Sequence, residues 1–126
     1  MNNNISILVV DDSRLMRDMV SYALETAGYE DITLAEDGVD ALEKADTKEF
    51  DLIVTDINMP NMNGFELCEE LRKKEIYPLT PIVVLTTEAS TKMKERGKKA
   101  GASAWLIKPF VPEELLYVIE KLLAKK

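Results

Sequence analysis

Acidic, hydroxyl and amine side chains follow the apolar runs of this chain, each at the point where a predicted strand ends. They are Asp11, Asp12, Asp56, Thr86 and Lys108. Parallel strands in an open sheet end at one edge, which is where such sheets bind ligands. We therefore expect these side chains to lie close together, although they are far apart in the sequence.

Three carboxylates held together repel one another unless a cation sits among them. The chain has no histidine and one cysteine, so its metal ligands would be oxygen atoms. Few, hard oxygen ligands suit Mg²⁺, which often binds together with a phosphate oxygen. A lysine and a hydroxyl facing the same point favour a phosphoryl group. A carboxylate can act as the nucleophile, which would place an acyl phosphate on an aspartate.

Each motif alone also has an ordinary structural interpretation. Asp11-Asp12-Ser13 after a strand is often a helix N-cap, and Lys108-Pro109 is often a solvated turn. The occurrence of all of them at successive strand ends favours a site.

The elements that must position these residues alternate, with a strand followed by a helix five times. Apolar runs predict strands near residues 5–10, 32–35, 52–54, 82–85 and 102–107. Residues 52–54 show no alternation with polar residues, which indicates a strand buried on both faces. This order predicts an α/β three-layer sandwich with a parallel sheet and right-handed crossovers.

The helices are marked by caps and by apolar residues at helical spacing. Ser13 and the Asp37-Gly38 turn precede the first two helices, and Pro112 begins the last one. The apolar positions in the first helix are Leu15, Met16, Met19, Val20, Ala23 and Leu24. In the second they are Val39, Leu42 and Ala45, and in the third Phe65, Leu67 and Leu71. The last helix should bury Leu115, Ile119, Leu122 and Leu123 and run to the end of the chain.

Length and composition limit the classes of function. The 126 residues suit one domain with a single full core, and a lone cysteine excludes an internal disulfide. A net charge of -7 argues against direct nucleic-acid binding. The apolar runs are too short for a membrane span, and the first residues do not resemble a secretion signal, so we expect a cytoplasmic protein.

Four motifs together resemble the receiver domains of two-component response regulators, and most of all the stand-alone receivers of chemotaxis. The motifs are LVVDDS (8–13), DINMPNMNG (56–64), LTTEA (85–89) and AWLIKPF (104–110). The resemblance covers essentially the whole chain. It implies a single receiver domain over residues 1–126 with no output domain. It also implies a flavodoxin-like (βα)5 fold with a five-stranded sheet of order 2-1-3-4-5.

The resemblance implies that Asp56 is the phosphoacceptor. Asp12 and Asp56 would then bind Mg²⁺ directly, Asp11 mostly through water, and Asn58 through its backbone carbonyl. Thr86 would hydrogen-bond the phosphoryl group.

Further residues match family positions with other roles. Lys108 would pair with the phosphoryl group, and the Lys108-Pro109 bond matches a cis peptide. Met59-Pro60 and Gly64 would shape the loop. Asn58 and Glu88 match two positions that tune dephosphorylation.

The implied function is a phosphorylation-activated switch. A histidine kinase would donate the phosphoryl group from a phosphohistidine, and water would later remove it. The protein would catalyse both of its own steps without conventional substrate turnover, and a phosphatase could assist the second. The expected target is the flagellar motor switch. The alternative is a phosphorelay shuttle that passes the group to a histidine phosphotransfer protein. A monomer that binds neither nucleic acid nor membrane is expected.

The output surface is expected around the fourth helix, near residues 90–100. Its inner face would be Ala89, Met93, Gly97 and Ala100, and its outer face carries Lys92, Lys94, Arg96, Lys98 and Lys99. This helix is either a solvated surface element or a low-stability element that shifts and meets an acidic partner. Trp105, the only tryptophan, stands where the family usually has the Tyr or Phe that turns inward on activation. Indole is larger and has one N–H donor, so the extent of that movement is left open.

Two other classes fit the sequence less well. A phosphatase of the haloacid dehalogenase type also uses an aspartyl phosphate, but its D-x-D motif does not match Asp11-Asp12-Ser13. A DNA-binding regulator would need residues for an output domain.

Overall fold

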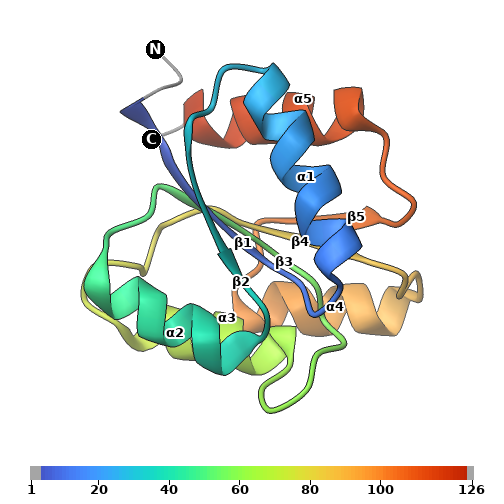
Figure 1. Cartoon of the computed structure of the whole chain (residues 1–126). Helices are drawn as coiled ribbons and strands as arrows, with labels where there is room; N and C mark the ends of the chain where they lie inside the picture. The colour runs from blue at the N-terminus through green and yellow to red at the C-terminus, as the bar shows by residue number, and fades with distance from the viewer. Residues whose placement is uncertain (1–3, 125–126) are drawn as a thin grey trace.

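The computed structural model describes residues 4–124, with strands and helices in strict alternation (Figure 1). The strands are β1 (Ser6–Val10), β2 (Asp31–Ala35), β3 (Leu52–Thr55), β4 (Ile82–Thr86) and β5 (Ala104–Ile107). The helices are α1 (Arg14–Thr26), α2 (Gly38–Thr47), α3 (Gly64–Lys73), α4 (Thr91–Ala100) and α5 (Pro112–Ala124).

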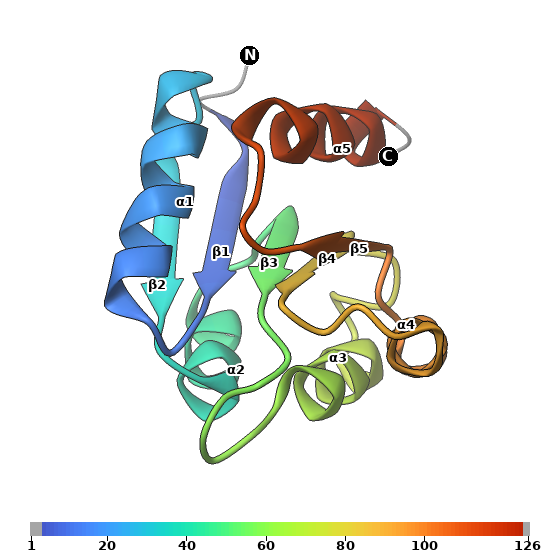
Figure 2. The same ribbon diagram turned by 90° about the vertical axis from the view of Figure 1, so that its right-hand side faces the viewer.

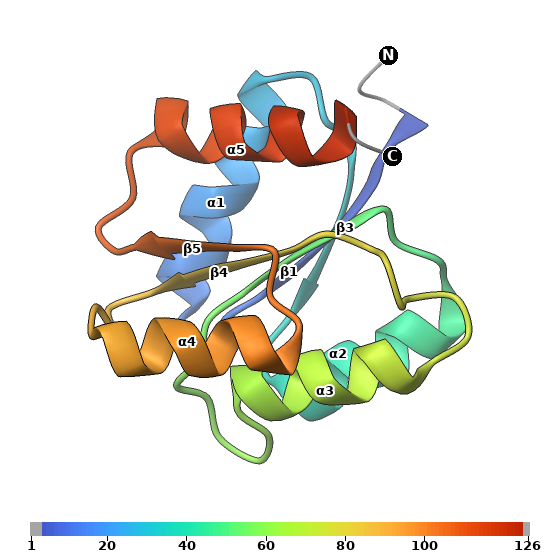
Figure 3. The ribbon, with the colours of Figure 1, turned by 180° about the vertical axis from the view of Figure 1, so that it is seen from behind.

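The five strands form one parallel sheet of order β2-β1-β3-β4-β5, which confirms the predicted fold. Helices α1 and α5 cover one face of the sheet, and α2, α3 and α4 cover the other (Figures 1 and 2). Seen from behind, α4 runs beside α3 and below β5, the edge strand (Figure 3). The register pairs Val10 with both Ala35 and Thr55, so β1, β2 and β3 end level with one another.

The central strands β1, β3 and β4 are apolar except for one end residue each, Ser6, Thr55 and Thr86, because both of their faces are covered. In β1, Leu8 and Val10 join the core under α2 and α3, while Ile7 and Val9 join the core under α1 and α5. β3 is buried along its whole length. Two separate apolar layers therefore hold the sheet, and the polar residues after the strand ends are left at its rim.

Side-chain caps start the helices close behind the strand ends. The Ser13 hydroxyl accepts a hydrogen bond from the Met16 amide at the start of α1, as the sequence predicted. Asn63 and Glu66 form a reciprocal capping box at the start of α3. The loop from β1 to α1 spans residues 11–13, whereas the loop from β3 to α3 is longer and spans residues 56–63.

Some apolar positions differ from the expected inner faces. Leu15 and Met19 are exposed, because the buried positions of α1 are Val20, Ala23 and Leu24. Val39 is exposed because α2 buries Gly38, Ala41 and Ala45 instead. Leu122 and Leu123 are half-buried against the α5 side of the core.

Helix α5 runs to Ala124, and the predicted extension to the last residues lies outside the described range. Among residues 4–124, no helix combines the length and apolar character that crossing a membrane requires.

Candidate functional site

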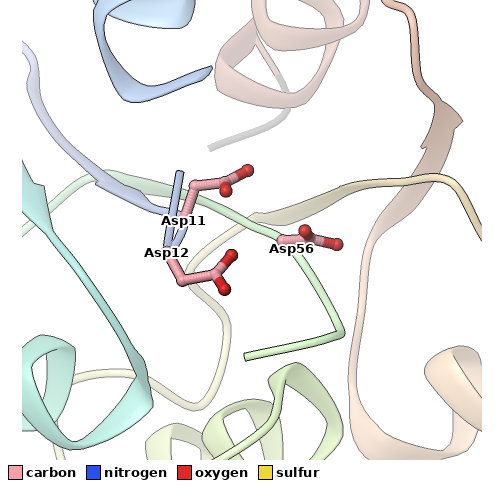
Figure 4. Close-up of side chains that lie close together, drawn as sticks. All are labelled: Asp11, Asp12 and Asp56. Carbon is pink, nitrogen blue, oxygen red and sulfur yellow. The ribbon is translucent and has the colours of Figure 1, made fainter. Parts of the chain in front are cut away.

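Three carboxyl groups gather at the rim of the sheet, where β1 and β3 end (Figure 4). Asp11 and Asp12 directly follow β1, and Asp56 directly follows β3, the neighbouring strand. One oxygen from each lies within 4.8 Å of the others. Asp11 and Asp56 are buried, whereas Asp12 is exposed. The predicted convergence of these acids is therefore present.

Lys108, which directly follows β5, reaches the same point. Its ammonium donates to Asp11 Oδ2 at 2.8 Å and to Asp56 Oδ2 at 2.9 Å. Burial by itself would lower the pKa of Lys108, but the hydrogen bonds to Asp11 and Asp56 outweigh burial and raise the pKa above its ordinary value. The peptide bond to Pro109 is cis, as the sequence motif predicted.

Backbone amides fix the two buried carboxylates. The Ser13 amide donates to Asp11 Oδ1 at 2.9 Å, and the Ile57 amide donates to Asp56 Oδ1 at 2.6 Å. Each carboxylate thus has one oxygen held by its own loop and the other held by Lys108. Burial raises the pKa of the Asp11 carboxyl, and the opposing effects of Lys108 and of the Ser13 amide do not cancel that rise.

The donor set fits a divalent cation. Three ionised carboxylates carry a charge of -3 and Lys108 carries +1, which leaves -2 in a small region. All three side chains offer hard oxygen atoms, and the cluster contains no sulfur or imidazole, so the chemistry suits Mg²⁺ rather than a softer metal. Asp12, Asp56 and Asp11 would hold the ion.

The remaining predicted residues lie at the end of β4 and in the loops that follow β3 and β4. Thr86 is the last residue of β4 and is buried, and its hydroxyl accepts a hydrogen bond from the Glu88 amide at 3.3 Å. The Asn58 side-chain amide donates to Glu88 Oε2 at 2.9 Å, so these two residues contact each other across the loops after β3 and β4.

Trp105 lies in β5 with its indole half-buried under α4. Its Nε1–H donates to the Glu88 carbonyl at 2.8 Å, and its ring stacks on Phe65 with centroids 6.2 Å apart. Gly97 and Ala100 of α4 are buried beside this region, as predicted, and Met93 is half-buried. Ala89 is exposed, because it precedes the N-cap Ser90 and so lies outside the helix.

The loop after Asp56 depends on Gly64. A Cβ on Gly64 would stand 2.3 Å from the Asp56 carbonyl oxygen, so only glycine allows this approach. Sequence reasoning missed Asn61, which has a positive φ of 68° and donates to Asp37 Oδ2 at 2.7 Å. The one available signal was the tolerance of asparagine for left-handed backbone in a polar loop.

A family model described as the response regulator receiver domain matches residues 7–120. The chain is 40% identical over 123 residues to chemotaxis protein CheY1 of Helicobacter pylori, covering 94% of this chain and 97% of that protein.

Solved structures agree with this likeness. Chemotaxis protein CheY4 of Vibrio cholerae superposes with a TM-score of 0.89 at 47% identity, over 94% of this chain and 98% of that one. The receiver domain of a sensor histidine kinase from Pseudomonas aeruginosa superposes with a TM-score of 0.88 at 29% identity, over 95% and 98% of the two chains. That structure has a magnesium ion coordinated in its active-site cleft.

Proposed function

The chain belongs to the response regulator receiver family, and we propose that it accepts a phosphoryl group on Asp56 from a histidine kinase. Its similarity to CheY proteins makes it a receiver of the CheY type in two-component signalling. We propose that residues 1–126 act as one receiver domain in the cytoplasm, as a monomer, and that Mg²⁺ is its cofactor.

The observation that carries this proposal is the bridge from Lys108 to Asp11 and Asp56. This bridge places the Lys108 ammonium group between two carboxylates, with the exposed Asp12 beside them. Such a centre can stabilise the negative charge that spreads over phosphoryl oxygens during transfer. Asp56 sits on a rigid strand end with one oxygen fixed by the Ile57 amide, so its second oxygen is aimed at the cluster.

In the transfer step, a carboxylate oxygen of Asp56 attacks the phosphorus of the kinase phosphohistidine. The P–N bond breaks, and its electron pair stays on the imidazole nitrogen, which takes up a proton. A P–O bond forms, and the product is an acyl phosphate. Lys108 moves its hydrogen bond from the carboxylate to a phosphoryl oxygen, and the Thr86 hydroxyl donates to another. Bound Mg²⁺ would supply charge neutralisation at the phosphoryl oxygens.

The reset is hydrolysis. Water attacks the phosphorus, and the P–O bond to Asp56 breaks. Inorganic phosphate is released, and the carboxylate of Asp56 is restored. Asn58 and Glu88 are joined by a hydrogen bond, and Asn58 is two positions after Asp56, which supports a role for the pair in setting the lifetime of the acyl phosphate.

Replacing Asp56 by Asn tests the phosphoacceptor. Asp56→Asn keeps the size of the side chain but removes the nucleophilic carboxylate. We expect no phosphoryl label after incubation with Mg²⁺ and acetyl phosphate, measured by intact-protein mass spectrometry. Asp18→Asn, on the exposed side of α1, should label like the wild type. Wild-type labelling of Asp56→Asn, with the modification mapped to another residue, would contradict the assignment.

The output surface that we propose comprises α4, β5 and α5. The outer face of α4 carries five exposed basic residues: Lys92, Lys94, Arg96, Lys98 and Lys99. Val111 is exposed nearby, and Trp105, Ile107 and Val118 are half-buried. A basic face with an apolar border suits an acidic partner that also offers apolar side chains.

The likeness to chemotaxis proteins favours the flagellar motor switch as the target, with a phosphorelay shuttle as the alternative. Two measurements separate them: binding of phosphorylated protein to a motor-switch peptide, and transfer of the label to a histidine phosphotransfer domain. Phosphorylation-dependent binding without transfer supports the motor-switch function, and transfer without stable binding supports the shuttle.

A further inference from the structure

The indole of Trp105 occupies space that a side chain at position 97 would need. A Cβ built on Gly97 would stand 2.4 Å from Cζ3 and 2.8 Å from Cε3 of the ring. Non-bonded carbon atoms normally approach to about 3.5–4.0 Å. Gly97 is buried in the interior of α4, so the missing side chain lets the helix and the indole lie in direct contact.

The indole has little freedom to move away from Gly97. Trp105 pairs with Val84 in the sheet, so its backbone is fixed. Its N–H donates to the Glu88 carbonyl, and its ring stacks on Phe65 of α3, which also lies under the Arg96 guanidinium at 4.1 Å. Rotation of the ring would break both the hydrogen bond from its Nε1–H to the Glu88 carbonyl and the stacking on Phe65.

Glu88 connects this contact to the phosphorylation site. Its backbone carbonyl accepts from Trp105, its backbone amide donates to the Thr86 hydroxyl, and its carboxylate accepts from Asn58. Asn58 is two positions after Asp56. Glu88 therefore links the indole under α4 to the end of β4 at Thr86 and to the loop that follows Asp56.

We propose that Gly97 and Trp105 form a size-matched pair that positions Glu88, and through Glu88 sets the lifetime of the acyl phosphate. Gly97 and Trp105 are positioning residues, because neither touches the reacting atoms. The kinetic part rests on the proposed function, whereas the size matching does not. The pair also accounts for a glycine in a helix interior, where alanine is intrinsically favoured.

A double-mutant cycle in stability tests the size matching without phosphorylation. In the Trp105→Ala background, Gly97→Ala should lower the unfolding equilibrium constant about fivefold, as the helix preference for alanine predicts. In the wild-type background the same change should raise that constant. If the single variant Gly97→Ala does not fold, the proposal is also supported when the double variant Gly97→Ala, Trp105→Ala does fold. Equal stabilisation in both backgrounds would overturn it.

Fluorescence gives a second structural measurement, because Trp105 is the only tryptophan. Gly97→Ala should shift its emission to longer wavelength and increase quenching by acrylamide, since the ring is forced off the Glu88 carbonyl. Glu95→Ala, an exposed change in the middle of the same helix, is the matched control and should leave both unchanged. Wild-type emission and quenching in Gly97→Ala would contradict the proposal.

The kinetic measurement uses protein labelled with acetyl phosphate and Mg²⁺. Gly97→Ala should shorten the lifetime of the label, because loosening Glu88 from Asn58 opens the approach of water. In the Glu88→Ala background, Gly97→Ala should have no further effect. If the wild type does not become labelled, the proposed function is refuted, whereas the double-mutant cycle in stability still tests the size matching of Gly97 and Trp105. Normal labelling with an unchanged lifetime in Gly97→Ala would overturn the kinetic part alone.

Discussion

At the scale of single residues, the hydrogen bonds around a carboxylate decide what it does. Burial raises the pKa of Asp11 in the acidic cluster. Asp37 has the opposite shift, because the Asp40 amide and the Asn61 side chain donate to it and lower its pKa. Asp37 is the N-cap of α2 and holds the loop that follows the site through Asn61. It is therefore a structural acid, whereas Asp11 belongs to the site.

The role of Asp37 predicts a pH-dependent loss of stability. Its ionised form stabilises the native state above the unfolded pKa of about 3.9, and that contribution is lost as the pH falls through the lower native pKa. Asp37→Ala should cost about 1 kcal/mol at pH 7, the usual value of a lost cap. The difference from wild type should shrink below about pH 4.

Urea unfolding of both proteins from pH 7 to pH 3 measures this difference. Asp37→Asn is the control, because asparagine keeps a capping oxygen but has no charge to titrate. A difference between wild type and Asp37→Ala that stays constant over this range would argue against the charged cap.

Sequence reasoning succeeded for residues that stand directly after strands. Asp11, Asp56 and Lys108 could be placed because parallel strands end at one rim. The hydrogen bond from Asn61 to Asp37 joins two loops 24 residues apart, and no periodic pattern extends into loops. The contact of Gly97 with Trp105 was missed for a related reason: it depends on how far α4 approaches β5, and spacing along the chain does not encode that distance.

At the scale of elements, α4 buries fewer residues than α2 and α3, the helices with which it covers one face of the sheet. It buries Gly97 and Ala100, whereas α3 buries a much larger apolar set: Phe65, Leu67, Cys68 and Leu71. Burial of a large apolar side chain stabilises by about 1.5–3 kcal/mol, so α4 gains far less from the core than α3 does. An element with so little buried surface opens locally more readily than its neighbours.

Amide hydrogen exchange should therefore be faster in α4 than in α3. We expect peptides covering residues 91–100 to exchange before those covering residues 64–73 in hydrogen–deuterium exchange mass spectrometry. Phosphorylation should change the rates in α4 more than in α3, because Glu88 links the site to Trp105 under α4. Equal protection of the two helices would show that the indole contact anchors α4 as firmly as a full apolar face.

At the scale of the whole molecule, we expect the acidic cluster to make stability depend on divalent cations. A ligand that binds only the native state raises stability by about 2.7 kcal/mol at a concentration a hundredfold above its dissociation constant. Mg²⁺ should therefore raise the melting temperature of the wild type. Asp12→Asn should melt higher than wild type without the metal, because repulsion is relieved, and should respond less to Mg²⁺.

Differential scanning calorimetry with and without Mg²⁺ measures both effects, with sodium chloride at matched ionic strength as the control. An equal rise for wild type and Asp12→Asn would indicate general charge screening rather than a site at the cluster.

The whole fold was predictable in part. Alternating strands and helices required a parallel sheet covered on both faces, and the apolar run of β3 placed that strand in the interior. The order β2-β1-β3-β4-β5 came with the family resemblance, because periodicity identifies strands without saying which of them are neighbours.

The strand order also has a consequence for folding. Strands β3 and β4 lie between β1 and β5, so residues that follow β1 and β5 are brought together only when the strands between them are in place. Lys108 follows β5, and its bond to Asp11 joins residues 97 apart in the sequence, which makes it among the costliest contacts to close. Until that contact forms, the carboxylates lack their lysine counterion. An assembled site therefore requires that β1, β3, β4 and β5 have all come together, and we expect chains that lack this arrangement to be unable to receive a signal.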